Sequence, residues 1–250
     1  MKLSVIIPTC NESQYLHKTI NTLINHAEAR QHLEIIVVDC GSSDGTVTTI
    51  KHKSVVIVEN AQLRGKKWKS LNLGGRLAQG EILLFLDADT QVPPNFDTSI
   101  RQALEDEHVI GGAFEFDFDD SSFLLNLIIF VNRLRYRWRK SYYGDQGIFV
   151  RNSVFKEVKG WPNRNLLEGA YFCKELKKHG KLVLLRQSVK TSARRFQQNG
   201  VGKMLIKDLK IWLMNLIGRD VEKFAADYWA ENQQAVYSRG KAGLKSSTIA

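Results

Sequence analysis

The chain has 250 residues, 43% of them hydrophobic, and a formal net charge of +10 at pH 7. This hydrophobic content is sufficient for a full core, so the composition excludes a disordered chain and predicts one domain with short additions. No run of about 18 apolar residues occurs, and residues 3–7 are typical of a strand rather than of a signal peptide. We therefore expect neither a secreted nor a membrane-spanning protein.

Short apolar runs alternate with helical patterns in the first part of the chain. Runs of Val, Ile and Leu without polar alternation are typical of strands buried on both faces of a sheet. The predicted strands are residues 3–7, 33–38, 55–58 and 82–86, and the predicted helices are residues 13–29, 44–52 and 66–78. This alternation predicts an α/β fold with a mostly parallel sheet flanked by helices.

The pattern changes from about residue 94. Here we expect helices at residues 94–107, 121–140 and 168–179, and strands at residues 112–117, 144–150 and 181–185. An amphipathic helix follows at residues 203–214. Beyond about residue 220 the chain becomes polar, and we expect a loose tail.

Polar residues follow the first four predicted strands. Ligands of parallel sheets bind beyond the carboxyl ends of the strands, so we expect these residues to form one rim. They are Thr9 to Glu12, Asp39 to Asp44, Glu59 with Asn60, and Asp87 to Asp89.

The fourth strand leads into Asp87-Ala88-Asp89. In an extended segment, side chains two residues apart point the same way and their Cα atoms lie about 6 to 7 Å apart. Both carboxylates would then address one ligand, and such oxygen ligands suit Mg²⁺ or Mn²⁺. The alternative is that one aspartate caps the following turn and the other is solvated.

Two further segments suit a nucleotide. Asp39 can accept hydrogen bonds from the edge of a base, whereas Ser43 and Asp44 are also good helix N-caps, so simple capping is the alternative. Residues 64–67, Arg-Gly-Lys-Lys, open a helix where backbone N–H groups and cations favour a diphosphate. A solvated basic turn is the alternative there, and Glu12 equally suits the first turn of a helix.

In this order the segments resemble the family 2 glycosyltransferases, which use a nucleotide-diphosphate sugar as donor and adopt the GT-A fold. The resemblance rests on VIIPTCNE at residues 5–12, VVDCGSSDGT at 37–46, RGK at 64–66 with LNLG at 71–74, and LDAD at 86–89. Weaker matches, including GDQG at residues 144–147 and TSARR at 191–195, look like a bacterial subgroup.

The resemblance implies a Rossmann-like GT-A domain with C-terminal amphipathic helices. Residues 1–110 would form the nucleotide-sugar-binding half, residues 111–200 the acceptor-side half of the same domain, and residues 201–250 an amphipathic helix with a polar tail. Asp89 would bind Mn²⁺ or Mg²⁺. The implied donor-binding residues are Pro8, Thr9, Glu12, Asp39, Ser43, Asp44, Lys66 and Asp87.

The catalytic base of this family is usually the Asp of a Glu-Asp pair at the start of a late helix. Here that place reads Glu168-Gly169, so a glycine stands where the base is expected. Neighbouring helical side chains differ by about 100° in direction, so Glu168 is not a direct substitute. Three explanations stay open: Glu168 reaches inward from an irregular helix start, Asp145 serves instead, or catalysis is weak or lost. Asp145 also suits a simple Asx-turn.

The predicted function is therefore an inverting, metal-dependent glycosyl transfer to an unidentified hydroxyl of a small-molecule, lipid or glycan acceptor. The rival is a non-catalytic protein that binds a nucleotide sugar and sits on a membrane or partner, which Gly169 favours. A sugar nucleotidyltransferase is disfavoured because no Gly-rich nucleotide loop follows the first strand.

Two basic segments favour an anionic partner. Arg133, Arg135, Arg137, Arg139 and Lys140 follow an apolar run, and Lys203, Lys207 and Lys210 share one helical face. Both segments fit either peripheral membrane contact or packing on protein. We expect no nucleic acid, because stacking aromatics are not interleaved with the cations.

Three cysteines without CxxC spacing indicate a reducing compartment, so we expect a cytoplasmic protein, with the inner face of the membrane as one possible site. Arg194 or Arg195 suits either the donor diphosphate or the surface.

Overall fold

The computed structural model describes residues 1–48, 50–226 and 228, apart from the side chains of Arg135, Trp138 and Arg139. The chain divides into two compact units, Met1–Ser192 and Ala193–Ala250. The boundary expected after residue 200 falls inside the second unit. Most of the tail expected to be loose, residues 229–250, lies outside the described residues.

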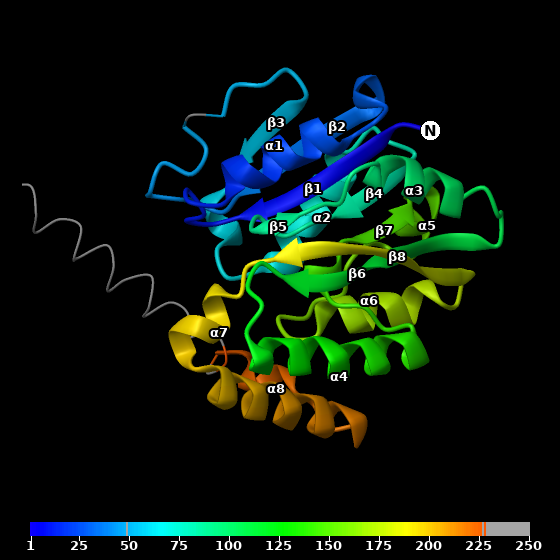
Figure 1. The fold of residues 1–250 in the computed structure, drawn as a ribbon. Coiled ribbons are helices and arrows are strands. Elements are labelled where there is room, and N and C mark those ends of the chain that lie inside the picture. Colours follow the sequence, from blue (N-terminus) through cyan, green and yellow to red (C-terminus); the bar gives the residue numbers. More distant parts are fainter. Residues whose placement is uncertain (49, 227, 229–250) are drawn as a thin grey trace, which may run out of the picture. The chain divides into compact units, whose positions relative to one another are not determined.

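The first unit is built on an eight-stranded mixed sheet (Figure 1) with the order β3-β2-β1-β4-β7-β6-β8-β5. β1 pairs in parallel with β2 and β4, β2 with β3, and β6 with β8. β7 runs antiparallel to β4 and β6, and β5 to β8. The strands are β1 Leu3–Thr9, β2 Leu33–Asp39, β3 Val55–Glu59, β4 Ile82–Phe85, β5 Thr90–Gln91, β6 Val109–Phe118, β7 Ile148–Arg151 and β8 Lys181–Thr191.

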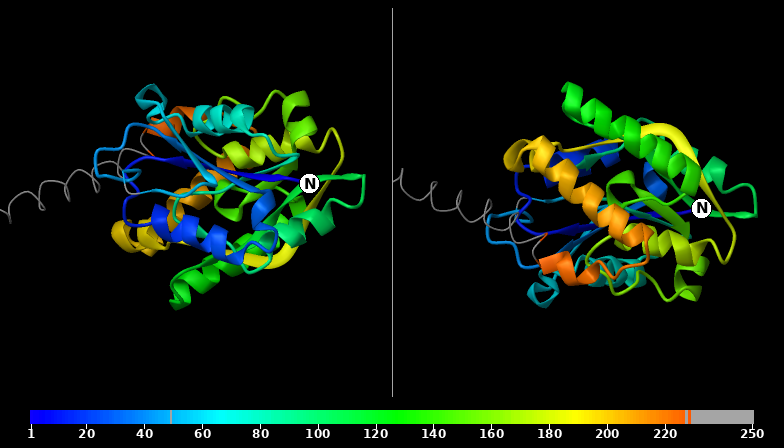
Figure 2. Two further views of the ribbon diagram at one scale, coloured as in Figure 1. Left: turned by 90° about the horizontal axis from the view of Figure 1, so that it is seen from above. Right: turned by 90° about the horizontal axis from the view of Figure 1, so that it is seen from below.

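Helices cover both faces of this sheet, with α1 and α4 on one face and α2 and α6 on the other (Figure 2). The helices of the first unit are α1 Leu16–His26, α2 Lys67–Leu77, α3 Phe96–Ala103, α4 Phe123–Arg139, α5 Asn152–Glu157 and α6 Glu168–Leu176, with the 3-10 helices η1 Arg30–His32, η2 Ala61–Leu63 and η3 Gly144–Gln146. The second unit contains α7 Arg194–Asn199, α8 Val201–Leu216 and η4 Glu222–Phe224. The predicted α/β class, with a mostly parallel sheet flanked by helices, is confirmed.

The apolar runs of β1, β2 and β4 form the centre of the core, as expected for strands covered on both faces. The same expectation for β3 is wrong. Its residues are half-buried or exposed, and Val56 is 49% exposed. β3 lies at one edge of the sheet, where a strand has a neighbour on one side only. The apolar pattern of its sequence does not reveal this position.

One predicted helix is wrong. Residues 46–48, inside the predicted helix 44–52, form a turn. Capping of this helix was the alternative role of Asp44, but its carboxylate accepts the backbone N–H of Ser13. Gly45, with φ +81°, turns the chain toward the loop after β1.

Besides the 3-10 helices, one short strand and two short α-helices are absent from the prediction: β5, α5 and α7. β5 has only two residues and exists because it pairs with β8. β8 itself continues six residues beyond its predicted end, since β6 pairs with it along its whole length. These differences depend on pairing partners that are far away in the sequence.

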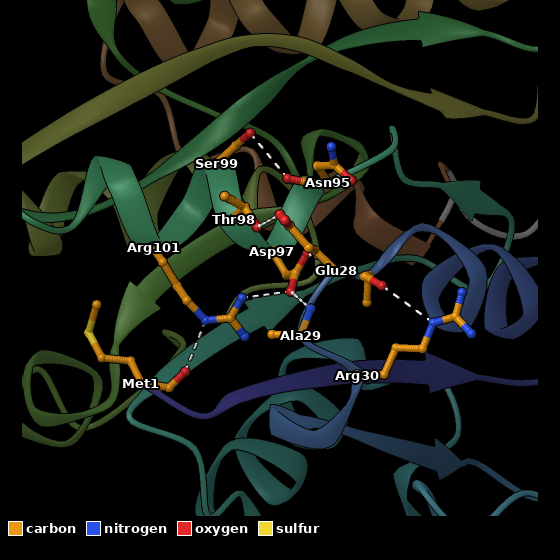
Figure 3. A network of polar contacts seen from close by, with 10 residues as sticks. Met1, Glu28, Ala29, Arg30, Asn95, Asp97, Thr98, Ser99 and Arg101 are labelled. Atoms are coloured by element: carbon orange, nitrogen blue, oxygen red, sulfur yellow. Dashed lines mark hydrogen bonds and ion pairs between the residues drawn. The ribbon is translucent and has the colours of Figure 1, made fainter.

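A buried carboxylate fixes α3 against the segment after α1 (Figure 3). Asp97 accepts the backbone N–H groups of Glu28 and Ala29, each at 3.0 Å, and Arg101 Nη1 at 2.6 Å. Arg101 Nε in turn donates to Met1 O at 3.0 Å. Burial alone would raise the pKa of Asp97, but the hydrogen bonds from Arg101 and the backbone hold it below its ordinary value.

Candidate active site

The carboxyl ends of β1, β2 and β4 meet at one edge of the sheet. In the parallel register Thr9 lies beside Asp39. The backbone N–H of Leu86 donates to Ile6 O at 3.0 Å, so Asp87 leaves β4 at the edge where β1 ends. The structure thus places the tips of these three strands on one rim, as the sequence predicts.

Hydrogen bonds join the loop after β1 to the loop after β2. Asn11, whose φ is +57°, donates its backbone N–H to Ser42 Oγ at 2.8 Å, and its Oδ1 accepts the backbone N–H of Ser43 at 2.9 Å. The backbone N–H of Glu12 donates to the buried Thr46 Oγ1 at 2.8 Å. The two predicted nucleoside-binding loops therefore form one connected structure. Asn11 and Thr46 are not among the predicted site residues, because no local pattern shows that these loops meet.

Asp44 completes this connection. Its carboxylate accepts the backbone N–H groups of Ser13 at 3.1 Å and Thr46 at 3.0 Å. Burial alone would raise the pKa of Asp44, but the hydrogen bonds from Thr46 and Ser13 lower it below its ordinary value. The ionised carboxylate thus holds the two loops together, and its contact with a nucleoside stays a prediction.

Asp39 is held by its own loop. The side chain is buried, and its Oδ2 accepts the backbone N–H groups of Gly41 at 3.1 Å and Ser42 at 2.8 Å. Its Oδ1 accepts the Ser42 hydroxyl at 2.5 Å. A carboxylate has about four acceptor positions, so the geometry leaves capacity for a donor group of a base.

Thr9 offers a polar atom for a ligand. Its Oγ1 is buried and has no hydrogen-bond partner within residues 1–48, 50–226 and 228. A buried hydroxyl without a partner is costly, so a bound molecule with a complementary group would be stabilised here. Pro8 precedes it, half-buried and beside Val38 in the register.

The Asp87-Ala88-Asp89 segment is a turn, so the expectation of an extended segment is wrong. The backbone N–H of Thr90 donates to Asp87 O at 3.1 Å. Ala88 O accepts the hydroxyl of Thr19 on α1 at 2.8 Å. This anchored turn, rather than strand alternation, decides where the two carboxylates point.

Lys67 connects two of the predicted acidic residues. Its Nζ lies 2.6 Å from Asp87 Oδ1 and 3.6 Å from Glu168 Oε1. We call these three residues the acid–lysine cluster. Lys66, predicted to hold the diphosphate, is the exposed N-cap of α2. The position at which α2 begins decides which of the two adjacent lysines pairs with the acidic residues. The contact of Lys66 with a diphosphate stays a prediction.

The pKa values of Lys67 and Glu168 are both raised in this cluster. Burial alone would lower the pKa of the Lys67 ammonium, but Asp87, Glu168 and Asp145 raise it well above its ordinary value. Burial raises the pKa of Glu168 above its ordinary value, while the charge of Lys67 opposes this rise. Lys67 is therefore a permanent cation, and Glu168 binds a proton more readily than an exposed glutamate.

The backbone around residue 169 explains the missing aspartate. A Cβ at Gly169 would lie 2.8 Å from Tyr142 O and 3.0 Å from Tyr143 Cα, so a side chain there would require the backbone to move. The preceding Leu167 has φ +56°, so α6 begins irregularly. As a result Glu168, rather than residue 169, faces Lys67. This geometry favours the first of the three explanations.

Asp145 lies in η3, beside the cluster, and its charge acts on Lys67. The neighbouring Gln146 is buried and donates its amide to Phe114 O at 3.2 Å, which fixes η3 on β6. A Cβ at Gly144 would lie 2.9 Å from Lys67 Nζ, so this turn packs directly against the cluster. Asp145 therefore stays a second candidate for the base.

Aromatic packing beneath the site positions α2 and α6. Phe172 of α6 stacks on Trp161 with ring centroids 4.3 Å apart, and both rings contact Phe85 of β4. Asn72 of α2 donates its side-chain amide to the backbone oxygen of Trp161 at 2.9 Å, and its Oδ1 accepts the backbone N–H of Trp161 at 2.7 Å. The turn at Trp161 thus holds both helices that contribute to the acid–lysine cluster.

A metal ion at this rim would have to take part of its ligand shell from a bound diphosphate and water. In the part of the chain that the structure describes, no group of three or more His, Cys, Asp or Glu residues is arranged to hold a metal. Asp87 forms an ion pair with Lys67, and Asp89 stays the metal ligand that the family resemblance implies. Mg²⁺ and related ions commonly bind one or two carboxylates and complete their shell with substrate phosphates and water.

Arg195 takes part in the packing of the second unit. Its guanidinium lies over the ring of Tyr228, 4.4 Å from the centroid, and 3.3 Å from Asp208 Oδ1. Tyr228 donates its hydroxyl to the same Asp208 oxygen at 2.6 Å. These contacts connect α7 to α8 and account for Arg195 without a diphosphate.

Curated relatives resemble this chain over limited segments. The poly(ribitol-phosphate) beta-N-acetylglucosaminyltransferase TarS of Staphylococcus aureus is 32% identical over 96 residues, which is 37% of this chain and 17% of TarS. The related enzyme TarP of the same species is 32% identical over 114 residues, 44% of this chain and 33% of TarP. The chain therefore matches well under half the length of either relative.

Solved structures show the same fold over most of the chain. The crystal structure of S. aureus TarS has a TM-score of 0.62 at 18% identity and covers 77% of this chain and 37% of TarS. The mannosyltransferase PcManGT from Pyrobaculum calidifontis, solved with GDP-Man and Mn²⁺, has a TM-score of 0.60 at 23% identity and covers 76% and 56%. The GT-A prediction is confirmed. The family model described as glycosyl transferase family 2 matches residues 4–158, more than half of the sequence, and the chain belongs to that family.

Proposed function

We propose that this glycosyltransferase inverts the anomeric centre of a nucleotide-diphosphate sugar and depends on a divalent metal. The observation that carries this proposal is the placement of Glu168 beside Lys67 and Asp87 at the sheet edge where the donor is expected. A buried carboxylate of raised pKa at this position suits general base catalysis. Gly169, which suggested a non-catalytic protein, is explained by the backbone that packs against it.

In this mechanism Glu168 accepts the proton of the acceptor hydroxyl while that oxygen bonds to the anomeric carbon. Lys67 holds the carboxylate in place and favours its ionised form, which is the form that can accept a proton. Asp89 would hold Mn²⁺ or Mg²⁺, and the metal when bound would stabilise charge on the leaving diphosphate. Thr9 and Asp39 would contact the nucleoside from the other side of the rim.

The donor and the acceptor are proposed from chemistry shared with the similar proteins. A truncated TarS was solved with UDP-GlcNAc and PcManGT with GDP-Man, so we propose a hexose linked to a nucleoside diphosphate. TarS and TarP are named for a poly(ribitol-phosphate) acceptor, which is an anionic polymer. A net charge of +10 suits an acceptor hydroxyl that is presented on an anionic glycan or at a membrane surface.

The base assignment is tested with Glu168→Gln, which keeps the shape of the side chain but removes its capacity to accept a proton. We expect sugar transfer to fall by about 10² to 10⁴-fold, while the donor still raises the melting temperature. Asp145→Asn is the matched variant from the same cluster and should cost less. Unchanged transfer in Glu168→Gln would overturn the assignment, and a larger loss in Asp145→Asn would move it to Asp145.

Transfer itself is measured with a panel of nucleotide sugars and acceptors, and the product configuration is read by NMR. Inversion of the anomeric centre is the expected result. Donor binding without turnover on any acceptor would support the non-catalytic alternative, and retention of configuration would contradict the single-displacement mechanism.

A further inference from the structure

Exposed apolar side chains are concentrated on two helices. Among the described residues, the exposed large apolar side chains outside α4, α8 and the residue after α8 are those of Met1, Val56 and Leu77. The others form one group in each unit of the chain. They are Phe123, Leu124, Leu127, Phe130, Val131 and Leu134 on α4, and Ile206, Leu209, Leu213 and Leu216 with Ile217 on or directly after α8.

On α8 these side chains form one continuous stripe. Ile206, Leu209, Leu213 and Leu216 recur at intervals of three and four residues, which places them on one face of the helix. The opposite face is buried through Met204 and Ile211. Ile206 is 70% exposed although it lies in the middle of the helix. No other part of the described structure packs on this stripe. It is thus an exposed apolar surface that is separate from the core.

The charges of α8 are sorted in the same way. Lys203, Lys207 and Lys210 lie along one border of the stripe, and Lys207 Nζ also lies 5.1 Å from the centroid of the Tyr228 ring. Asp208 is the single acidic residue within α8 and faces the other way, toward Arg195. An apolar stripe with a basic border, and with its acidic residue turned inward, is typical of a helix that lies in a membrane interface.

α4, in the first unit, also has a buried face and an exposed apolar face. Its inner face is buried through Leu125, Ile128, Ile129 and Tyr136. Arg133 and Arg137 both form ion pairs with Glu115 of β6, which anchors this face to the sheet. The outer face carries Phe123, 82% exposed, and Phe130, 59% exposed. Lys140 follows as the exposed C-cap.

We propose that the outer faces of α4 and α8 bind an anionic lipid bilayer, each by inserting its apolar stripe between the headgroups. Lysine is depleted at the centre of protein interfaces but favoured beside anionic headgroups, so the basic border of α8 fits lipid better than a second copy of the chain. None of the helices in the described residues has the length and hydropathy needed to span a bilayer. This inference extends the proposed function by naming the surface at which it operates, but membrane binding does not require catalysis.

The test is flotation of the full chain with vesicles of phosphatidylcholine alone or mixed with phosphatidylglycerol. We expect binding to the mixed vesicles that weakens with added salt. Ile206→Glu with Leu213→Glu should lower the vesicle affinity about tenfold or more, and so should Phe130→Glu with Leu134→Glu. Leu77→Glu, an exposed apolar residue on α2, is the matched control and should bind like the wild type.

The basic border is tested by Lys203→Gln with Lys210→Gln. This pair should weaken binding to anionic vesicles by roughly fivefold for each lysine, and it should leave binding to neutral vesicles unchanged. Circular dichroism and the donor-induced rise in melting temperature establish that each variant is folded and that its donor site is intact. Failure of the enzyme proposal would appear as absent sugar transfer, and flotation would be unchanged.

Three results would overturn the proposal. The first is a wild type that does not float with anionic vesicles. The second is that the glutamate variants float as well as Leu77→Glu. Alternatively, light scattering would show an oligomer that the same α8 or α4 variants dissociate, which would assign these faces to contact between copies of the chain.

Discussion

A lysine between two carboxylates dominates the electrostatics of the site. Lys67 is held by Asp87 and Glu168, which come from segments about 80 residues apart in the chain. Burial raises the pKa of Glu168, and the ammonium of Lys67 opposes this rise because it favours the ionised carboxylate. Lys67 thus positions the proposed base and also controls its protonation.

Replacing Lys67 with Met should therefore change the pH dependence of transfer as well as its rate. Without the ammonium, the pKa of Glu168 rises further, and the acidic limb of the kcat/KM profile should move to higher pH by about one unit or more. Lys67→Arg keeps the charge and should restore most of the wild-type profile. A reduced rate with an unmoved acidic limb would show that Lys67 acts only on structure.

At the scale of elements, hydrogen bonds between loops and helices hold the sheet edge in place. The loops after β1 and β2 are joined through Asn11, Thr46 and Asp44, and α3 is joined to the segment after α1 through Asp97. In each case a polar side chain satisfies backbone N–H groups of a different segment. A local pattern does not reveal such a partner, which is why the helix at residues 44–52 was wrongly predicted.

Asp97→Asn should destabilise the first unit by about 2 kcal/mol at pH 7, because it weakens a buried network of charge-assisted hydrogen bonds. The pKa of Asp97 is lowered in the folded state, so its contribution is present above the ordinary carboxyl pKa of about 3.9 and is lost as the pH falls through the folded-state pKa. Urea unfolding at several pH values measures this.

The difference between Asp97→Asn and the wild type should narrow below about pH 4. The exposed Glu105→Gln is the control, and we expect it to have little effect at any pH. A difference of the same size at every pH would show that the network does not depend on the ionised carboxylate.

For the whole molecule, the proposed donor would bring its own negative charge to the rim. Since the described residues contain no group of three metal-ligating side chains, Mn²⁺ alone should hardly change the melting temperature. Mn²⁺ with a bound nucleotide sugar should raise it by about 5 °C or more at concentrations well above Kd, because only the folded state binds.

Asp89→Ala should remove the Mn²⁺-dependent part of that stabilisation, and Glu105→Ala should keep it. Thermal-shift measurements with and without Mn²⁺ for each variant provide the check. Equal stabilisation by Mn²⁺ in Asp89→Ala and in the wild type would contradict the assignment of Asp89 to the metal.

Sequence alone determined the α/β class, the strands of the sheet centre and the rim that carries Asp39, Asp87 and Asp89. These follow from apolar periodicity and from polar residues at strand ends, both of which are local. The tertiary structure decided that Lys67 rather than Lys66 joins the cluster, that β3 lies at the edge, and that Gly169 has no space for a side chain. Each of these depends on which distant segments pack together, and a one-dimensional pattern contains no information on that packing.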